Sequence, residues 1–334
     1  SDLLRILDRM QGKTIVVYGD IVADRFIHGV PKRISREAPV LILRQERQDL
    51  ILGGGGNAIS NIRSLGGNPR PVSVIGDDAT GEQILDALQG KSIEISSVAR
   101  VSGYQTPTKT RVLAGMPHAA RQQIVRFDQE DELEIDQTLL EKLETTLREA
   151  MRGADGALIS DYGYGAVRSE LASMICETSG DRPVTLDSRY DLLNYRGVTA
   201  ATPNEEEAQA AAGIDLFGPD EERNLYQVGN LLRTKLRSPA LLITRGSRGM
   251  ALFEADRETP TLIPVYGTDQ IADVTGAGDT VIATFTLGLA AGASFMEAAR
   301  LANYAGAVVV MKMGTATASA EEIANLVRRD DSLD

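Results

Sequence analysis

The chain has 334 residues, a formal net charge of −12, 43% hydrophobic residues and 25% charged residues, which is the composition of an ordinary globular protein. Its negative charge argues against a nucleic-acid or membrane partner, and one cysteine with two histidines argues against a disulfide or a zinc cluster. No apolar run approaches the roughly 20 residues of a membrane-spanning helix and no signal peptide opens the chain, so we expect a cytoplasmic protein.

The first predicted elements are a helix, a strand and an excursion from the main domain. The helix-like "LLRILDRM" leads to the β-branched strand "KTIVVYGD", which ends at Asp20. Residues 24–52 then alternate apolar and polar side chains between turn residues, and residues 104–128 show the same two-residue period. We expect these two segments to form a small antiparallel sheet.

Elsewhere, strand-like and helix-like segments alternate along the chain, as in "GALISDYG" followed by "RSELASMICET". Repeated units of this kind predict an α/β fold with a mostly parallel central sheet covered by helices on both faces. Ligands of such sheets bind outside the carboxyl ends of the strands. The residues that follow predicted strands, and are expected at this edge, are Asp20, Asp161, Asp187, Asn204 and Gly246.

The stretch "DVTGAGD" places Gly276, Ala277 and Gly278 before Asp279 at the start of an apolar helix. Small residues let an anion approach the unpaired N–H groups of a helix start, where the helix dipole favours negative charge. A neighbouring carboxylate suits a base that takes the proton of a hydroxyl attacking a bound phosphoryl group, whose charge the N–H groups stabilise. Taken alone, the pattern also fits an ordinary first-turn aspartate with glycine-softened packing.

A second glycine-rich helix start is "LGGGGNAISNIRSLGG", in which Asn57 offers a donor and an acceptor to a polyol. Gly53, Gly55 and Ala58 also match G-x-G-x-x-A, the dinucleotide fingerprint, and Asp77 follows about 20 residues later. Against that interpretation, the segment follows the inserted sheet rather than the first strand. A tightly packed turn without ligand is the third alternative.

Two further segments follow predicted strands. In "ATPNEEEA", Asn204 and Glu207 are three residues apart at a helix start, so both can face one edge and hold a hydrated divalent cation; an N-cap with an acidic first turn is the alternative. In "LLITRGSRGM", backbone N–H groups and Arg245 lie at a strand end, and the alternative is a hairpin turn.

Together these segments resemble the signatures of the ribokinase-like (PfkB) carbohydrate kinases over essentially the whole chain, including "TRGSRG" and the late "AGAVVVMKMGT". More narrowly, "GDIVADRF", "KRISREAPV", "TKTRVLAG", "QQIVRFD" and "ISDYGYGAV" are similar to bacterial heptose 7-phosphate kinases. The resemblance implies a ribokinase-like three-layer α/β/α fold in which the small sheet, at about 24–52 and 104–128, forms a lid.

The sequence departs from the heptose kinases where those read "SDYAKG" and "DPKG". This chain has "SDYGYG" and "DSRY", so Tyr164 and the pair Ser188–Arg189 replace lysine-bearing patterns, and only Arg189 keeps the positive charge. Some of those kinases carry a second, nucleotidyltransferase domain with an H-x-G-H motif, whereas the only histidines here are His28 and His118. We therefore expect a stand-alone kinase with a single domain over residues 1–334.

The resemblance assigns roles position by position. Asp279 is the general base, and Gly276, Ala277 and Gly278 bind the transferring phosphoryl group through their N–H groups. Residues of the ATP site are Asn204, Thr244, Arg245, Gly246, Gly249 and Asn303. Asn204 and Glu207 hold Mg2+ through water, and Asp273, Thr275 and Gly314 resemble positions of a monovalent-cation site, for K+; a plain loop at a strand end is the alternative there.

On the acceptor side the expected sugar-binding residues are Asp20, Gly54, Gly55, Asn57 and Asp161, and the expected phosphate-binding cations are Arg33, Lys109, Arg111 and Arg126. In the alternating strand "TKTRV", Lys109 and Arg111 share one face and can meet a phosphate; solvent-facing charges on an edge strand explain them equally well.

The function implied is transfer of the γ-phosphoryl group of ATP to D-glycero-D-manno-heptose 7-phosphate, giving the 1,7-bisphosphate. Alternatives are a PfkB kinase of ribose, fructose or a phosphohexose and, more distantly, a dinucleotide-binding oxidoreductase. The apolar runs "VLIL" and "IVRF" favour a homodimer that pairs through the lid.

Overall fold

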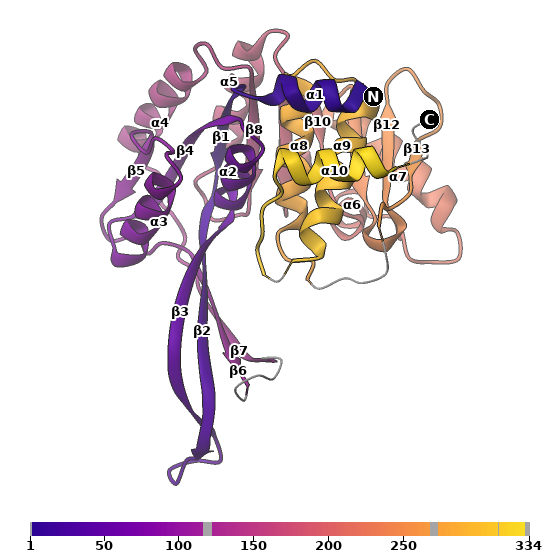
Figure 1. Ribbon diagram of the computed structural model, residues 1–334. Coiled ribbons are helices and arrows are strands. Elements are labelled where there is room, and N and C mark those ends of the chain that lie inside the picture. Colours follow the sequence, from indigo (N-terminus) through magenta and orange to yellow (C-terminus); the bar gives the residue numbers. More distant parts are fainter. Residues whose placement is uncertain (1, 116–121, 268–272, 313, 331–334) are drawn as a thin grey trace.

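A computed structural model describes residues 2–115, 122–267, 273–312 and 314–330, and its core is a central β-sheet (Figure 1). Within the described residues nine strands form this sheet, and all pairings are parallel except those of β12 with β11 and β13. The expected mostly parallel sheet is thereby confirmed. In spatial order the strands are β13 (Thr261–Ile263), β12 (Met250–Glu254), β11 (Ala240–Thr244), β10 (Ala200–Ala201), β9 (Val184–Ser188), β8 (Gly156–Asp161), β1 (Thr14–Gly19), β4 (Asn68–Gly76) and β5 (Val98–Val101).

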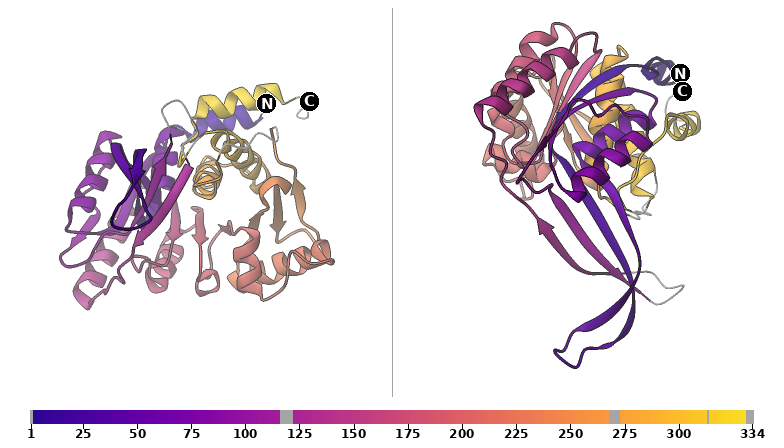
Figure 2. Two further views of the ribbon diagram at one scale, coloured as in Figure 1. Left: turned by 90° about the horizontal axis from the view of Figure 1, so that it is seen from below. Right: turned by 90° about the vertical axis from the view of Figure 1, so that its left-hand side faces the viewer.

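Helices cover both faces of the central sheet and complete three layers (Figure 2). Successive side chains of β1 point to opposite faces, so Ile15 and Val17 pack in one apolar cluster, while Val16 and Tyr18 pack in the other. The first face carries α1 (Asp2–Met10), α2 (Gly55–Ser64), α3 (Ala79–Gly90), α8 (Ala277–Ala290), α9 (Phe295–Val310) and α10 (Ala320–Arg329). The second carries α4 (Gln137–Ala150), α5 (Ser169–Ser179), α6 (Glu205–Ala212) and α7 (Glu221–Leu236).

A small sheet projects from one end of this core (Figure 1). Its strands, in spatial order, are β3 (Leu41–Gly54), β2 (Ile21–Ile34), β6 (Thr108–Ala114) and β7 (Gln122–Gln129). The two hairpins are antiparallel as expected, but β2 and β6 pair parallel because both strands run outward from the core. The segment 116–121 of the expected lid lies outside the described residues.

Burial decreases along β2: its first four residues are buried in the core and its last three are exposed. A strand of 14 residues extends for about 45 Å, so one continuous strand connects the core with the outer end of the small sheet. None of the described helices is both long and apolar enough to cross a membrane.

Candidate active site

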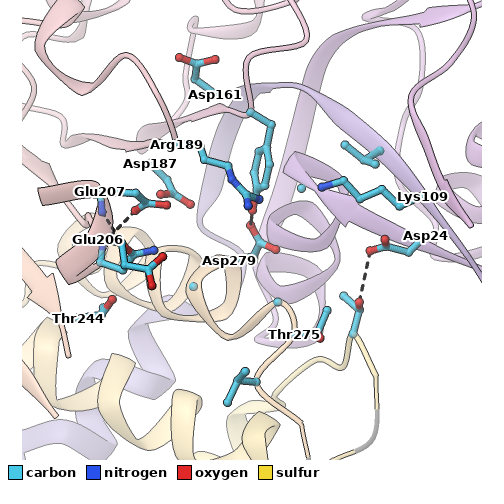
Figure 3. A pocket seen from close by; sticks show the side chains of 18 of the residues that line it. Asp24, Lys109, Asp161, Asp187, Arg189, Glu206, Glu207, Thr244, Thr275 and Asp279 are labelled. Carbon is cyan, nitrogen blue, oxygen red and sulfur yellow. Dashed lines mark hydrogen bonds between the residues drawn. The ribbon is translucent and has the colours of Figure 1, made fainter. Parts of the chain in front are cut away.

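A cavity of about 620 Å3 lies where the small sheet leaves the core, outside the carboxyl ends of the central strands. Three parts of the chain line it. The small sheet contributes Asp24, Lys109, Arg111 and Arg126, the strand ends contribute Asp161, Asp187, Arg189, Asn204 and Thr244, and the start of α8 contributes Thr275, Gly276, Gly278 and Asp279. Asp279 lies between Lys109 on one side and Asp187 with Glu207 on the other (Figure 3).

Asp279 lies in the first turn of α8, and its side chain is only 3% exposed. One carboxylate oxygen, Oδ1, accepts a hydrogen bond from Tyr162 Oη at 2.6 Å, and the other, Oδ2, accepts one from Asn57 Nδ2 at 3.0 Å. Burial raises the pKa of Asp279 to about 6, while these two hydrogen bonds favour the ionised form. The group can therefore accept a proton near neutral pH.

Asn57 reaches Asp279 from the start of α2. Its amide also donates to the Gly276 carbonyl at 3.1 Å, and its side-chain oxygen accepts from Asn61 at 3.1 Å. Asn57 is 1% exposed and is absent from the cavity wall. The structure thus places Asn57 behind the carboxylate, where it orients Asp279 instead of meeting a sugar hydroxyl as expected.

The start of α8 leaves open space on its cavity side. Gly276 has a φ of 76°, and an ideal Cβ there would lie 2.6 Å from Asn57 Nδ2, so glycine is required. A Cβ at Gly278 would meet no atom within 4 Å, and its N–H group has no acceptor among the described residues. The N–H group of Ala277 was expected to bind the transferring phosphoryl group, but the structure differs. It donates to the Val274 carbonyl at 3.2 Å and closes a turn instead of facing the cavity.

The small sheet brings cations to the cavity. Arg111 pairs with Asp24 at 2.6 Å, and Arg126 pairs with Asp128 through two hydrogen bonds. Lys109 has no carboxylate partner among the described residues; its ammonium lies 5.8 and 5.9 Å from the ring centres of Tyr162 and Tyr164. Burial and then the charge of Arg189 lower the pKa of Lys109. Lys109 is therefore a cation available for an anionic ligand.

The opposite wall is acidic. Asn204 and Glu207 form a reciprocal cap at the start of α6, with hydrogen bonds of 2.8 and 2.9 Å, so the N-cap alternative is realised while both residues still line the cavity. Burial and then the charge of Glu207 raise the pKa of Asp187 well above its usual value. Among the described residues no group of three or more acidic, histidine or cysteine side chains is arranged to hold a metal unaided. Oxygen donors of this kind fit Mg2+ that keeps its waters and phosphate ligands.

Like Asn57, two further residues predicted to bind the sugar or its phosphate, Asp20 and Arg33, lie outside the cavity wall. Asp20 is 2% exposed, and its carboxylate accepts hydrogen bonds from the N–H groups of Tyr162, Tyr164 and Ala166 at 2.8, 3.3 and 3.0 Å. It fixes the loop after β8 instead of binding sugar. Arg33 lies nine residues beyond Asp24 along β2, which is about 30 Å, and is exposed.

Of the other residues predicted to bind the sugar, Gly54 and Asp161 line the cavity and Gly55 does not. Gly54 lines the cavity, whereas Gly55 packs against the backbone of Asp20, where an ideal Cβ would lie 3.0 Å from the carbonyl oxygen. Asp161 lines the cavity, but its carboxylate already accepts hydrogen bonds from Ser188 at 3.0 Å and from Tyr195 at 2.6 Å. It therefore supports the wall of the cavity.

Only some of the residues expected to bind ATP line the cavity. Thr244 and Asn204 line the cavity, but Arg245 is paired with the buried Glu205 at 3.0 Å and does not face it. Gly246 begins a single 3-10 turn, Gly246–Arg248, and Gly249 follows it; the same glutamate also pairs with Arg248 of this turn at 2.7 Å.

Asn303 lines a second cavity of about 320 Å3 and donates to the Pro264 carbonyl at 2.8 Å. The structure therefore does not bring Asn303 to the wall that carries Asp279.

The three expected monovalent-cation residues are joined to one another. The Asp273 carboxylate accepts hydrogen bonds from the N–H groups of Thr275 at 2.9 Å and Gly314 at 3.0 Å, and these bonds help to hold its pKa below the usual value. This carboxylate thus connects the segment before α8 with the segment after α9.

Sequence reasoning missed Asp24 and Tyr162 as wall residues. Asp24 is in the alternating part of β2 and opposes Lys109 in the β2–β6 register, a pairing that no local pattern contains. Tyr162 directly follows the strand that ends at Asp161, so the strand-end argument applies to it as well.

Comparison with known proteins agrees with this arrangement. The model of the pfkB family carbohydrate kinases matches residues 13–323. Two proteins named bifunctional protein HldE are similar: that of Mesorhizobium japonicum is 37% identical over 98% of this chain and 64% of its own length, and that of Geotalea uraniireducens is 40% identical over 92% and 61%. The chain thus spans less than two thirds of the length of these relatives.

Solved structures share the fold. The ribokinase of Arabidopsis thaliana complexed with ribose and ATP superposes with a TM-score of 0.71 at 20% identity, covering 95% of this chain and 99% of that one. Escherichia coli phosphofructokinase-2 in complex with fructose-6-phosphate gives 0.73 at 20% identity, covering 96% and 99%. A ribokinase-like fold is therefore confirmed, and with the family match it defines a sugar kinase. The chain belongs to the PfkB family of carbohydrate kinases.

Proposed function

We propose that this kinase transfers the γ-phosphoryl group of ATP to the anomeric hydroxyl of D-glycero-D-manno-heptose 7-phosphate, forming the 1,7-bisphosphate and ADP. The observation that carries the choice of a phosphorylated acceptor is Lys109, a half-buried cation without a carboxylate partner among the described residues, on the wall beside Asp279. The resemblance to heptose 7-phosphate kinases and the HldE relatives support the heptose.

In this reaction Asp279 accepts the proton of the acceptor hydroxyl while the sugar oxygen bonds to the γ-phosphorus and the bond to the ADP oxygen breaks. The N–H group of Gly278 and the dipole of α8 stabilise the charge on the transferring group. Lys109 and the Arg111–Asp24 pair hold the 7-phosphate and the sugar. Each role follows from a position on the cavity wall.

Cations would complete the site. Asn204 and Glu207, with Asp187 beside them, would hold Mg2+ through water, and the metal would neutralise phosphate charge. Asp273, Thr275 and Gly314 would support K+ near the start of α8. Activity is expected to disappear when EDTA removes Mg2+ and to fall when N-methylglucamine replaces K+. An unchanged rate in either case removes that cation from the proposal.

The dinucleotide alternative receives no support from the geometry. A Cβ at Gly53 would collide with the Asp24 carboxylate, and Gly55 packs on Asp20, so these glycines serve contacts within the protein.

The acceptor is tested by measuring ADP release with ribose, fructose, fructose 6-phosphate and heptose 7-phosphate. We expect the highest kcat/KM for heptose 7-phosphate. A neutral sugar that performs equally well would overturn the proposed acceptor while leaving the kinase assignment intact.

Lys109→Ala provides the residue-level test of the same proposal. We expect KM for the phosphosugar to rise at least tenfold, about the value of one charge-assisted hydrogen bond, and KM for its unphosphorylated analogue to change less. The matched control is Lys32→Ala, which removes an exposed cation from the outer part of β2. Equal effects of Lys109→Ala on both acceptors would contradict a phosphate contact.

We also infer that the small sheet closes over the acceptor and pairs with a second copy of the chain. It exposes large apolar side chains, among them Ile34 at 68%, Phe127 at 56% and Ile124 at 51%. Apolar side chains gathered on one projecting sheet favour a covered surface in the assembled protein.

A further inference from the structure

We propose that Tyr162 is a positioning residue for the base: its phenol keeps the Asp279 carboxylate ionised and directed into the cavity. The inference rests on the proposed role of Asp279. Tyr162 follows β8, lines the cavity and donates its Oη–H to Asp279 Oδ1 at 2.6 Å. A bond this short to a carboxylate is of the charge-assisted, stronger kind.

The geometry gives each carboxylate oxygen of Asp279 its own donor, Tyr162 on Oδ1 and Asn57 on Oδ2. An ionised carboxylate has about four lone-pair sites, so both oxygens keep a lone pair for the acceptor hydroxyl. Tyr162 is itself held from behind, because its N–H donates to the buried Asp20 at 2.8 Å. By fixing the loop after β8, Asp20 thus also helps to fix the position of Tyr162.

Electrostatics explain why the base needs this donor. The charged groups that face Asp279 are Asp24 from β2, Lys109 from β6, Asp187 from β9 and, nearer the tyrosine, Glu207 from α6. Burial and Asp24 oppose ionisation of Asp279, whereas Tyr162, Asn57 and Lys109 favour it. Burial and then the charge of Asp279 raise the pKa of Tyr162 well above its usual value, so its phenol stays protonated and keeps donating.

The test is Tyr162→Phe, which removes the hydroxyl and keeps the ring beside Lys109. Loss of a donor to the ionised form raises the pKa of Asp279, so the acid limb of kcat/KM for heptose 7-phosphate at saturating ATP should move upward by about one pH unit. At pH 6.5 we expect kcat/KM to fall about threefold, at pH 5 to fall about tenfold, and at pH 8.5 to recover. Ionisation of the sugar phosphate is the same for both enzymes and cancels.

Tyr164→Phe is the matched control. Tyr164 also has its ring beside Lys109, but its hydroxyl donates to Glu130 at 3.0 Å and not to the base. Its acid limb should coincide with that of the wild type. An unmoved limb in Tyr162→Phe, or equal shifts in both variants, would overturn the inference.

A second measurement works without turnover. The infrared band of the protonated Asp279 carboxyl, assigned by its loss in Asp279→Asn, should titrate at higher pH in Tyr162→Phe, and at lower pH when 3-fluorotyrosine, a stronger donor, replaces Tyr162. Unmoved band midpoints reject the inference even if no sugar is turned over. Wild-type turnover by Asp279→Asn would reject the proposed base; an inactive Asp279→Asn with an unmoved limb in Tyr162→Phe rejects only the role of Tyr162.

Discussion

Asp279 combines burial with a role that requires its charge. Its pKa is raised from 3.8 to about 6, mainly by burial, so at neutral pH the folded chain holds an ionised carboxylate in an environment that disfavours it. A carboxyl group whose pKa is higher in the folded than in the unfolded state binds its proton more tightly in the folded state. Its favourable contribution to the free energy of unfolding is complete below the unfolded pKa and is lost as the pH rises through the folded pKa. The base is therefore maintained at the expense of folding free energy above pH 6.

Asp279→Asn is expected to separate activity from stability. kcat should fall about a thousandfold or more because the general base is lost, while the Kd for ATP changes little. At pH 7.5 the variant should melt a few degrees above the wild type, since a costly buried charge has been removed, and this difference should shrink as the pH approaches 4. Calorimetry at both pH values with a kinase assay checks the prediction, and retained turnover or a pH-independent difference in Tm would contradict it.

At this scale, the sequence predicted residue types better than side-chain directions. Asp20 and Asp24 are both aspartates near the end of the first strand, and only their orientation separates them: Asp20 turns inward to three N–H groups, and Asp24 turns to the cavity and Arg111. Arg245 was expected on a phosphate, but Glu205 is buried beside it and holds it. Such partners come from distant segments, so no local pattern contains them.

At the scale of elements, the site depends on two glycine-initiated helices that meet. The start of α2 supplies Asn57 and the start of α8 supplies Asp279, and the two side chains are joined by one hydrogen bond. The glycines at the start of α8 serve two different purposes. Gly276 makes room for Asn57, and Gly278 leaves room in the cavity.

Alanine substitutions should distinguish these purposes. In Gly276→Ala the new Cβ meets Asn57 at a positive φ, so we expect a loss of about 1–3 kcal/mol of stability together with reduced kcat. In Gly278→Ala the Cβ meets no atom of the described residues within 4 Å, so the melting temperature should equal or exceed that of the wild type while kcat falls at least tenfold. Thermal melts and steady-state kinetics provide the measurement. A Gly278→Ala enzyme with normal kcat would show that nothing binds closely at this helix start.

The elements themselves were largely predictable. Apolar runs and strand-to-helix alternation predict the parallel sheet, and the strand-end rule places Asp161, Asp187 and Asn204 on one wall, as observed. The parallel pairing of β2 with β6 was missed, because a two-residue period identifies a strand but carries no information about its neighbour's direction. That pairing is what sets Asp24 opposite Lys109 in the register of the small sheet.

At the scale of the molecule, the small sheet exposes apolar surface that a single chain leaves in contact with water. Its strand β7 is exposed along its whole length, although Ile124, Val125 and Phe127 are apolar. A second copy packed against this sheet would remove these side chains from water, with a gain of roughly 25 cal/mol for each Å2 of apolar surface.

Phe127→Glu should therefore convert a dimer into a monomer, as measured by light scattering coupled to size exclusion. Phe217→Glu is the control, because Phe217 is 54% exposed, close to the 56% of Phe127, but lies between α6 and α7, away from the small sheet. A wild-type chain that is monomeric at micromolar concentration, or equal effects of both variants, would contradict pairing through the sheet.

The path of β2 has a consequence for how the enzyme exchanges its substrates. The strand begins in the buried core at Ile21, places Asp24 on the cavity wall and continues to exposed residues, while Asp279 belongs to a helix of the core. A tilt of the projecting strands would thus carry Asp24, Lys109 and Arg111 away from the reacting centre. The wall formed by the core, where we propose that ATP binds, would stay in place. The sugar would then leave and be replaced while the nucleotide remains bound to the core. The order of product release would thus follow from the division of the cavity wall between the small sheet and the core.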